Sequence, residues 1–258
     1  MTIALALAGL VTAACASEDN QADLRPLALK EQTSSVVKSG AGYVVNWAGV
    51  LGNANRYHFG ENAVAVISAV DAGGKEVVHL EQPLDAVPPG GRLPFSGQAL
   101  SSVKPVRVKI DYRRASWRMA TRVPSAYLEF PVSDVTTERL PTGSYLVTGY
   151  VLDPFMKAAT SLAVTALLRD AAGKLLGGGT AYADNVRAND RRRFVVTVEG
   201  VSGGAVARTD VLATAWGATA KPYEELALAG AAPIHTVMPT TEPFAKDRGY
   251  QAINDRRQ

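Results

Sequence analysis

A cluster of basic side chains between residues 107 and 122 is the most concentrated chemical feature of this sequence. The segment "RVKIDYRRASWRMATR" interleaves six cationic residues with Tyr112 and Trp117. In an extended segment, alternate positions share one face, so these charges predict a cationic surface that attracts anionic groups. The candidate anion-binding residues are Arg107, Lys109, Arg113, Arg114, Arg118 and Arg122. The alternative is that the charges only protect an edge strand from pairing with other sheets.

Residues suited to catalysis are sparse and scattered. The three histidines, His58, His79 and His235, lie in three different expected segments, and none follows another by two or four positions, so no zinc site is expected. The sequence holds no Gly-x-Ser-x-Gly motif, and its only cysteine is Cys15. We therefore predict no catalytic residue, no metal and no cofactor. An enzyme with a loop-built site near His58, in the polar stretch "NRYHFGEN", is the minor alternative.

The N-terminal stretch "MTIALALAGLVTAACAS" has no charged side chain in its 17 residues. Its apolar run over residues 3–11 has the length of a secretory signal core and is too short to span a bilayer. "LVTAAC" resembles a bacterial lipobox, in which the cysteine is lipidated and becomes the mature N-terminus. We expect a signal peptide over 1–15, lipidation at Cys15 and a polar tether over 16–34. Cleavage at the Ala-x-Ala of residues 14–16, or an N-terminus that belongs to the fold, are the alternatives.

A nearly identical pentapeptide occurs twice, 99 positions apart, as "DAGGK" at 71–75 and "DAAGK" at 170–174. In such a turn the aspartate accepts hydrogen bonds from the following backbone, and the glycine supplies a positive φ. Alternating apolar stretches flank both copies, which is typical of β-hairpins. A duplicated unit of about 90 residues has the size of a domain. The repeat therefore predicts two similar β domains and needs no ligand to explain it.

Apolar alternation predicts strands through most of the chain. One expected face comprises Val106, Val108, Ile110 and Tyr112, a second Leu162, Val164, Ala166 and Leu168, and a third Phe194, Val196 and Val198. We predict an all-β protein with two tandem immunoglobulin-like antiparallel β-sandwiches, over 35–125 and 126–217. The expected core aromatics are Trp47, Phe95, Phe194 and Trp216.

The last segment, residues 218–258, changes character. Four prolines interrupt it and no period is sustained. Its stretch "YEELALAG" favours two helical turns that end at Gly230. We expect the rest to be an extended or disordered tail, whose aromatics, such as Tyr223, offer a means of docking on a partner or on the second domain.

The two halves resemble the tandem FxLYD-type domains of bacterial lipoproteins. The resemblance lies in the Asp-x-x-Gly-Lys hairpins, in "VPPGGRLPF" with Pro89, Gly90 and Phe95, and in Asp170 after "ALLR". It covers roughly residues 35–217, although the second copy, "VRANDRRRF", lacks the Pro-Gly turn. The resemblance implies an extracytoplasmic location and a non-catalytic role. It brings no known ligand.

Charge and compartment together define the expected partners. Residues 35–125 hold 11 basic and 6 acidic side chains, although the whole chain carries only +3. We expect a protein anchored to the outside of the cell membrane through a lipid on Cys15, which acts as an interaction or assembly module for an envelope protein. Binding of an anionic surface polymer or lipid through residues 107–122 is the alternative. Nucleic acid fits the chemistry but not the compartment, so we expect no nucleic-acid binding.

Overall fold

The structure is a computed structural model that describes residues 24–202 and 204–232 of the 258-residue chain. Within these residues the chain forms fourteen strands and one α-helix, so the all-β prediction is confirmed. The strands of the first half are β1 (Ala28–Ser39), β2 (Gly42–Gly52), β3 (His58–Glu61), β4 (Val64–Val70), β5 (Glu76–Pro83), β6 (Arg92–Ser101), β7 (Arg107–Arg113) and β8 (Ser116–Met119). Those of the second half are β9 (Val132–Arg139), β10 (Tyr145–Leu152), β11 (Ala159–Arg169), β12 (Leu175–Val186), β13 (Arg191–Val198) and β14 (Arg208–Ala215), and the helix is α1 (Lys221–Ala229).

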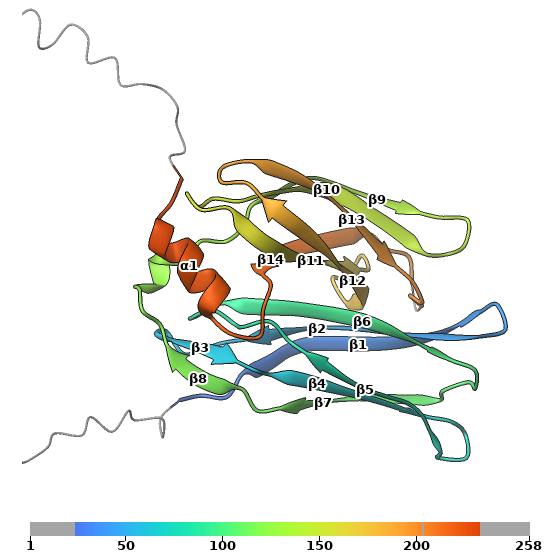
Figure 1. Cartoon of the computed structure of the whole chain (residues 1–258). Helices are drawn as coiled ribbons and strands as arrows, with labels where there is room; N and C mark the ends of the chain where they lie inside the picture. Colours follow the sequence, from blue (N-terminus) through green and yellow to red (C-terminus); the bar gives the residue numbers. More distant parts are fainter. Residues whose placement is uncertain (1–23, 203, 233–258) are drawn as a thin grey trace, which may run out of the picture.

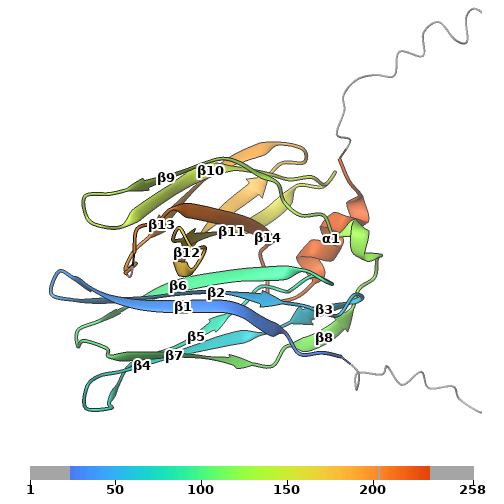
Figure 2. The same cartoon turned by 180° about the vertical axis from the view of Figure 1, so that it is seen from behind.

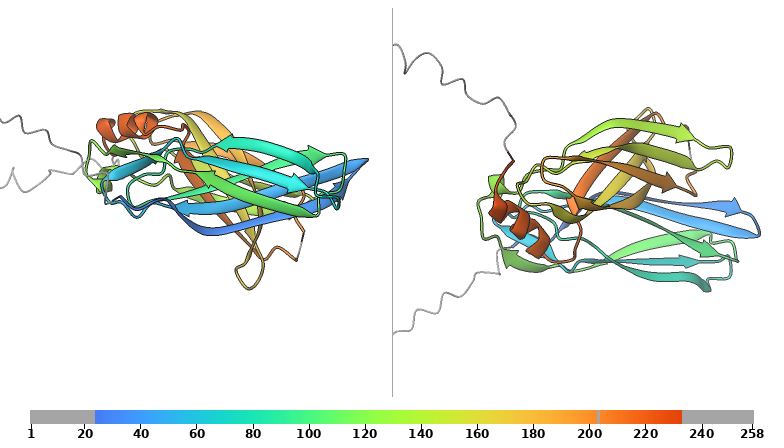
Figure 3. Two further views of the ribbon diagram at one scale, coloured as in Figure 1. Left: turned by 90° about the horizontal axis from the view of Figure 1, so that it is seen from below. Right: turned by 45° about the horizontal axis from the view of Figure 1, so that its top comes forward.

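Four antiparallel sheets stack as layers, two from each half (Figure 1). The first half contributes an outer sheet, β5-β4-β7, and an inner sheet, β1-β2-β6. The second half repeats this order with an inner sheet, β12-β11-β14, and an outer sheet, β9-β10-β13. Strands of the second inner sheet run obliquely across those of the first (Figure 3). The first half also carries a two-stranded ribbon, β3-β8.

The repeated pentapeptide forms the same turn in both halves. Oδ1 of Asp71 accepts hydrogen bonds from the N–H groups of Gly73 and Lys75, each at 2.9 Å. Oδ1 of Asp170 accepts from the N–H groups two and four positions further on, also at 2.9 Å. The glycines at the fourth position have φ of 80° and 82°, which a residue with a Cβ rarely adopts. These contacts account for the repeat by turn chemistry, as predicted.

A phenylalanine packs over a glycine at the same place in each half. Gly49 pairs with Phe95 across β2 and β6, and Gly149 pairs with Phe194 across β10 and β13. A Cβ on either glycine would lie 2.5 or 2.7 Å from the ring carbon Cζ, so only glycine leaves room for the ring. Both phenylalanines are buried, as is Trp47, and these three core predictions are confirmed.

The prediction that Trp216 belongs to the core is wrong. Its side chain is 54% exposed, because it directly follows β14 at the rim of the sheet. There it packs edge-on against Tyr182, which is also exposed, with ring centres 5.8 Å apart. Trp216 therefore belongs to the surface of the molecule.

Both faces of β11 are buried, although alternation alone predicts one buried face. The expected face, Leu162, Val164, Ala166 and Leu168, is fully inside the second half. The opposite face, with Ala163, Thr165 and Leu167, is buried as well, since the inner sheet of the first half covers it. Leu167 there joins an apolar cluster with Ala48, Val50 and Leu175.

A glycine run in β12 lets the two inner sheets approach closely. A Cβ on Gly178 would lie 3.0 Å from Cβ of Ala48 and 2.9 Å from the carbonyl oxygen of Ala166. The side-chain amide of Asn46 donates to the Gly178 carbonyl at 2.9 Å and accepts the Gly178 N–H at 3.3 Å. Because β12 is an edge strand, this buried amide pairs backbone groups that the sheet leaves free.

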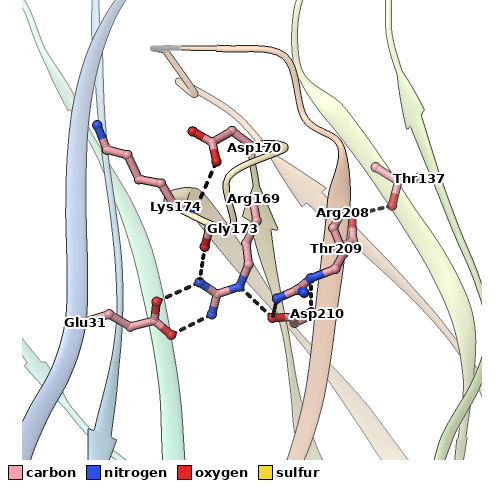
Figure 4. A network of polar contacts seen from close by, with 9 residues as sticks. All are labelled: Glu31, Thr137, Arg169, Asp170, Gly173, Lys174, Arg208, Thr209 and Asp210. Carbon is pink, nitrogen blue, oxygen red and sulfur yellow. Dashed lines mark hydrogen bonds and ion pairs between the residues drawn. The ribbon is translucent and has the colours of Figure 1, made fainter.

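An ion-pair network also joins the halves (Figure 4). Arg169 at the end of β11 donates to both carboxylate oxygens of Glu31 on β1, at 2.5 and 2.6 Å. Its Nε donates to Asp210 at 2.6 Å, and Asp210 also pairs with Arg208. The hydrogen bonds from Arg169 hold the pKa of Glu31 below its ordinary value of 4.5. A buried guanidinium paired in this way fixes the geometry between the two inner sheets.

The structure differs from the sequence-based boundaries at both ends. The tether expected over 16–34 overlaps β1, which begins at Ala28 and pairs with β2 along its length. Its polar, mostly exposed residues had suggested a tether, but an edge strand needs only one buried face. At the other end α1 is ordered, with Tyr223 and Leu226 buried. The signal segment with Cys15 and the chain after residue 232, including His235, lie outside the described residues.

Candidate functional site

The predicted basic residues lie along β7 and β8, at two separate places. Arg107, Lys109 and Arg113 are exposed on β7, the edge strand of the outer sheet, while alternate side chains Val108, Ile110 and Tyr112 face inward as predicted. Val106 precedes the strand and is 59% exposed, so its expected inward position is wrong. Arg107 lies beside the turn at Asp71, opposite Val70, whereas the later arginines lie at the far end of β7, roughly 20 Å away.

Ion pairs further divide the six residues. Lys109 pairs with Asp111 at 2.8 Å, Arg113 pairs with Glu81 on β5, and Arg118 pairs with Glu224 of α1 at 3.0 Å. The remaining three, Arg107, Arg114 and Arg122, are exposed and form no ion pair with the part of the chain that the structure describes. The six residues therefore do not form one continuous face: Arg113 and Arg114 precede the Ser116 end of β8, whereas Arg118 and Arg122 form a group at and beyond its Met119 end.

The β3–β8 ribbon positions this group beside residues that the sequence analysis missed. His58 pairs with Met119 across the ribbon, and the carbonyl of Tyr57 accepts the N–H of Ala120 at 2.8 Å. This pairing brings Tyr57, 53% exposed, next to Met119, 61% exposed. Arg56 lies one residue before Tyr57 and is exposed too. The dipeptide Arg-Tyr in a polar loop was the only signal in the sequence, and it does not say which strand lies beside it.

Helix α1 lies at the same end of the molecule as the ribbon and contacts it (Figure 2). Glu224 accepts the N–H of Thr121 at 3.2 Å in addition to its ion pair with Arg118. Glu61 of β3 accepts the N–H of Ala220, where the helix begins, at 2.7 Å. Both carboxylates thus point inward and are largely buried. The ribbon is consequently held against the helix, with Arg118 of β8 paired to Glu224.

An aromatic cluster fills the space between ribbon and helix. Phe59 of β3 contacts Tyr127 edge-on, with ring centres 4.9 Å apart, and Tyr223 of α1 lies among Tyr127, Phe130 and Phe155. The hydroxyl of Tyr223 donates to the carbonyl of Leu128, and burial raises the pKa of this phenol. These rings join both halves and the helix at one end of the molecule.

A groove of about 520 Å³ lies next to the ribbon. Its walls are the first described residues and the turn from β7 to β8, and it is lined mainly by apolar side chains, with Arg113 and Arg114 among them. The apolar residues include Leu24, Leu27, Leu29 and Trp117. The hydroxyl of the neighbouring Tyr112 donates to Gln32 at 2.8 Å. The described chain therefore starts at the same end of the molecule as the ribbon.

A second group of polar and aromatic residues surrounds Asp85, at the junction of the two halves. Its carboxylate accepts the N–H of Gly217 at 2.9 Å, and Thr214 donates to it at 3.5 Å. Burial outweighs these hydrogen bonds and raises the pKa of Asp85 to about 6. The space between Asp85, Tyr182 and Trp216 is only about 40 Å³. This volume is close to that of one or two water molecules and too small for an organic substrate.

The two described histidines, His58 and His79, lie on different strands. His58 is half-buried in the ribbon, and His79 is exposed on β5, where its Nδ1 lies 3.1 Å from Glu76. Over residues 24–202 and 204–232, no three His, Cys, Asp or Glu side chains are grouped as a metal site requires. Over the same ranges, no helix has the length and apolarity needed to cross a membrane.

The chain matches no model of a protein family, and it matches no curated protein.

Proposed function

We propose that this chain is a non-catalytic, extracytoplasmic lipoprotein that serves as an interaction or assembly module. In this proposal Cys15 carries the lipid, residues 1–15 are the signal segment, and the two halves are immunoglobulin-like sandwiches similar to FxLYD-type domains. The observation that supports it most is the duplication: both halves have the same sheet order and the same aspartate-centred turn. Duplicated sandwiches that fill their interiors with side chains are typical of surface modules that bind through their exterior.

The way the halves are joined suits a rigid spacer. Their inner sheets meet through the Gly178 contact and the pair between buried Arg169 and half-buried Glu31, and α1 closes the end of the junction. Such a body holds its two outer sheets, β5-β4-β7 and β9-β10-β13, at a fixed separation. Both outer faces thus remain available to envelope partners.

The proposed anchor also defines an orientation. Cys15 precedes Leu24 by nine residues, and nine extended residues span at most about 30 Å. Leu24 lines the groove beside the β3–β8 ribbon. A lipid on Cys15 would hold this end of the molecule near the bilayer and leave the turns at Asp71 and Gly40 farther from it.

Cell fractionation of the native chain beside a Cys15→Ala variant tests the location. We expect the native chain in the membrane pellet, resistant to 1 M salt washes and released by detergent, because an acyl anchor is held by apolar burial rather than by charge. The variant should lose the detergent-dependent fraction. Recovery of the native chain as a free cytoplasmic protein would rule the proposal out.

A further inference from the structure

We propose that the β3–β8 end of the molecule contacts anionic phospholipid directly, in addition to any acyl anchor. The contact surface consists of Arg56, Tyr57, Met119, Arg122 and Val123, at the end of the ribbon where His58 pairs with Met119, and we call it the lipid-contact surface. Its orientation toward a bilayer rests on the proposed function, whereas its affinity for anionic lipid rests on its own chemistry.

The charge of this surface is directed outward. Arg56 and Arg122 are exposed and have no carboxylate partner among the residues in the structure. The carboxylates that contact the ribbon, Glu61 and Glu224, are buried and bound to backbone N–H groups. Basic side chains held near an anionic leaflet each contribute about 1 kcal/mol to binding.

Three large apolar side chains accompany these cations. Tyr57, Met119 and Val123 are 53%, 61% and 65% exposed, although a well-packed aromatic cluster lies directly behind them. The Tyr57–Ala120 hydrogen bond and the His58–Met119 pairing place Tyr57 and Met119 at the same end of the ribbon, on opposite faces of it, and Val123 follows Met119 by four residues. Tyrosine is enriched at the headgroup level of membranes, where its ring meets apolar chains and its hydroxyl meets water. Cations around exposed apolar side chains are characteristic of a membrane-surface contact.

The position of the surface agrees with its chemistry. The first described residues, the ribbon and the end of α1 all lie at one end of the layered body (Figures 1 and 2). Leu24 lines the groove beside the ribbon together with Trp117 of β8, so the first described residues lie next to the ribbon. Eight residues lie between Cys15 and Leu24, few enough for a lipid on Cys15 to leave this surface within reach of the headgroups.

Vesicle flotation of the full chain with Cys15→Ala, which carries no acyl group, tests the proposal. The probes are vesicles of phosphatidylglycerol and phosphatidylethanolamine, and vesicles of phosphatidylcholine as the neutral comparison. We expect salt-sensitive binding to the anionic vesicles. Arg56→Gln with Arg122→Gln should weaken it roughly 10–30-fold, since two cations are removed. Met119→Ser should weaken it less, and at all salt concentrations.

Lys104→Gln with Arg107→Gln is the matched control, because it removes two charges from exposed residues at the opposite end. It should bind within about twofold of the parent, apart from the long-range effect of net charge. The apolar residues before Cys15 are common to all variants, so the difference between the two double variants reports the surface. Equal binding by the two double variants, with unchanged circular dichroism, would overturn the proposal. This result is independent of whether Cys15 is lipidated in the cell.

Discussion

Asp85 lies where the two halves meet, and its protonation is linked to folding. Its folded pKa of about 6 is above the ordinary value of 3.8, because burial disfavours the ionised carboxylate. Between about pH 4 and 6, the folded protein therefore keeps a proton on Asp85 that the unfolded chain has released. It follows that stability falls as the pH rises through this window and that the carboxylate stays destabilising above it.

Asp85→Asn should remove this pH dependence. The amide oxygen can still accept the Gly217 N–H, and the variant has no charge to bury. We expect the variant to be about 1–3 kcal/mol more stable than the parent at pH 7.5 and nearly equal to it at pH 3.5. Urea unfolding at the two pH values measures the difference. If the free energies of unfolding of parent and variant differed by the same amount at both pH values, the account would be contradicted.

Single residues also show what the sequence can predict. Phe95, Phe194 and the two turn aspartates were predicted, because the pattern around each is local. Trp216 was not, since whether a tryptophan at the end of a strand is covered depends on the neighbouring half. The carboxylate at residue 85 gave no sequence signal at all, because its pKa depends on groups more than 120 residues away.

At the scale of elements, helix α1 joins the β3–β8 ribbon to the second half. Two leucines on this helix differ in environment: Leu226 is 4% exposed within the aromatic cluster, and Leu228 is 65% exposed. The contacts of Glu224 and Tyr223 depend on the helix being seated. Packing of Leu226 should therefore contribute to the stability of the whole end of the molecule.

Leu226→Ala should destabilise the protein by about 2–4 kcal/mol, the range for a buried leucine that leaves a cavity. Leu228→Ala, on the exposed side of the same helix, should cost less than about 0.5 kcal/mol. Chemical denaturation measures both, and hydrogen exchange should show faster opening of β8 in the first variant only. Equal effects of the two substitutions would mean that α1 is not packed as described.

Elements were predictable where their signals were local. Strand alternation and the two Asp-Gly turns indicated the hairpins β4–β5 and β11–β12. The start of β1 at Ala28 was missed, because a polar edge strand looks like a tether until its partner β2 is known. Docking of α1 was raised only as one possibility for Tyr223, since nine residues of weak amphipathic pattern do not identify the surface that they cover.

At the scale of the whole molecule, the central feature is that the two halves are packed together by their inner sheets. Sequence repetition predicted two similar units but gave no information on their contact, because complementarity between Gly178 and Ala48 exists only in three dimensions. The six basic residues were all correctly expected on the surface. Their division between two ends of the molecule follows from the length of β7, whereas the sequence did not indicate that β8 pairs with β3 and brings Tyr57 beside it.

Glu31→Gln should weaken the contact between the halves. Arg169 would remain buried with Asp210 as its one remaining carboxylate partner, so we expect a loss of about 1–2 kcal/mol, less than for a fully unpaired charge. Because the folded pKa of Glu31 is lowered, its contribution is present above pH 4.5 and is lost as the pH falls through the folded pKa. Glu81→Gln, which removes the exposed pair with Arg113, is the control and should cost below about 0.5 kcal/mol. Similar losses of unfolding free energy in both variants at pH 7 would argue against a stabilising role of the Arg169–Glu31 pair.

Intact-mass spectrometry of the chain from the native membrane fraction tests the central claim most directly, with Cys15→Ala measured in parallel. The account predicts a chain that starts at Cys15 and carries the mass of a diacylglyceryl group, with or without a further acyl chain, and predicts that the variant lacks it. An unmodified chain that retains Met1 would contradict the account: the anchor, the extracytoplasmic location and the orientation toward the bilayer would all have to be given up.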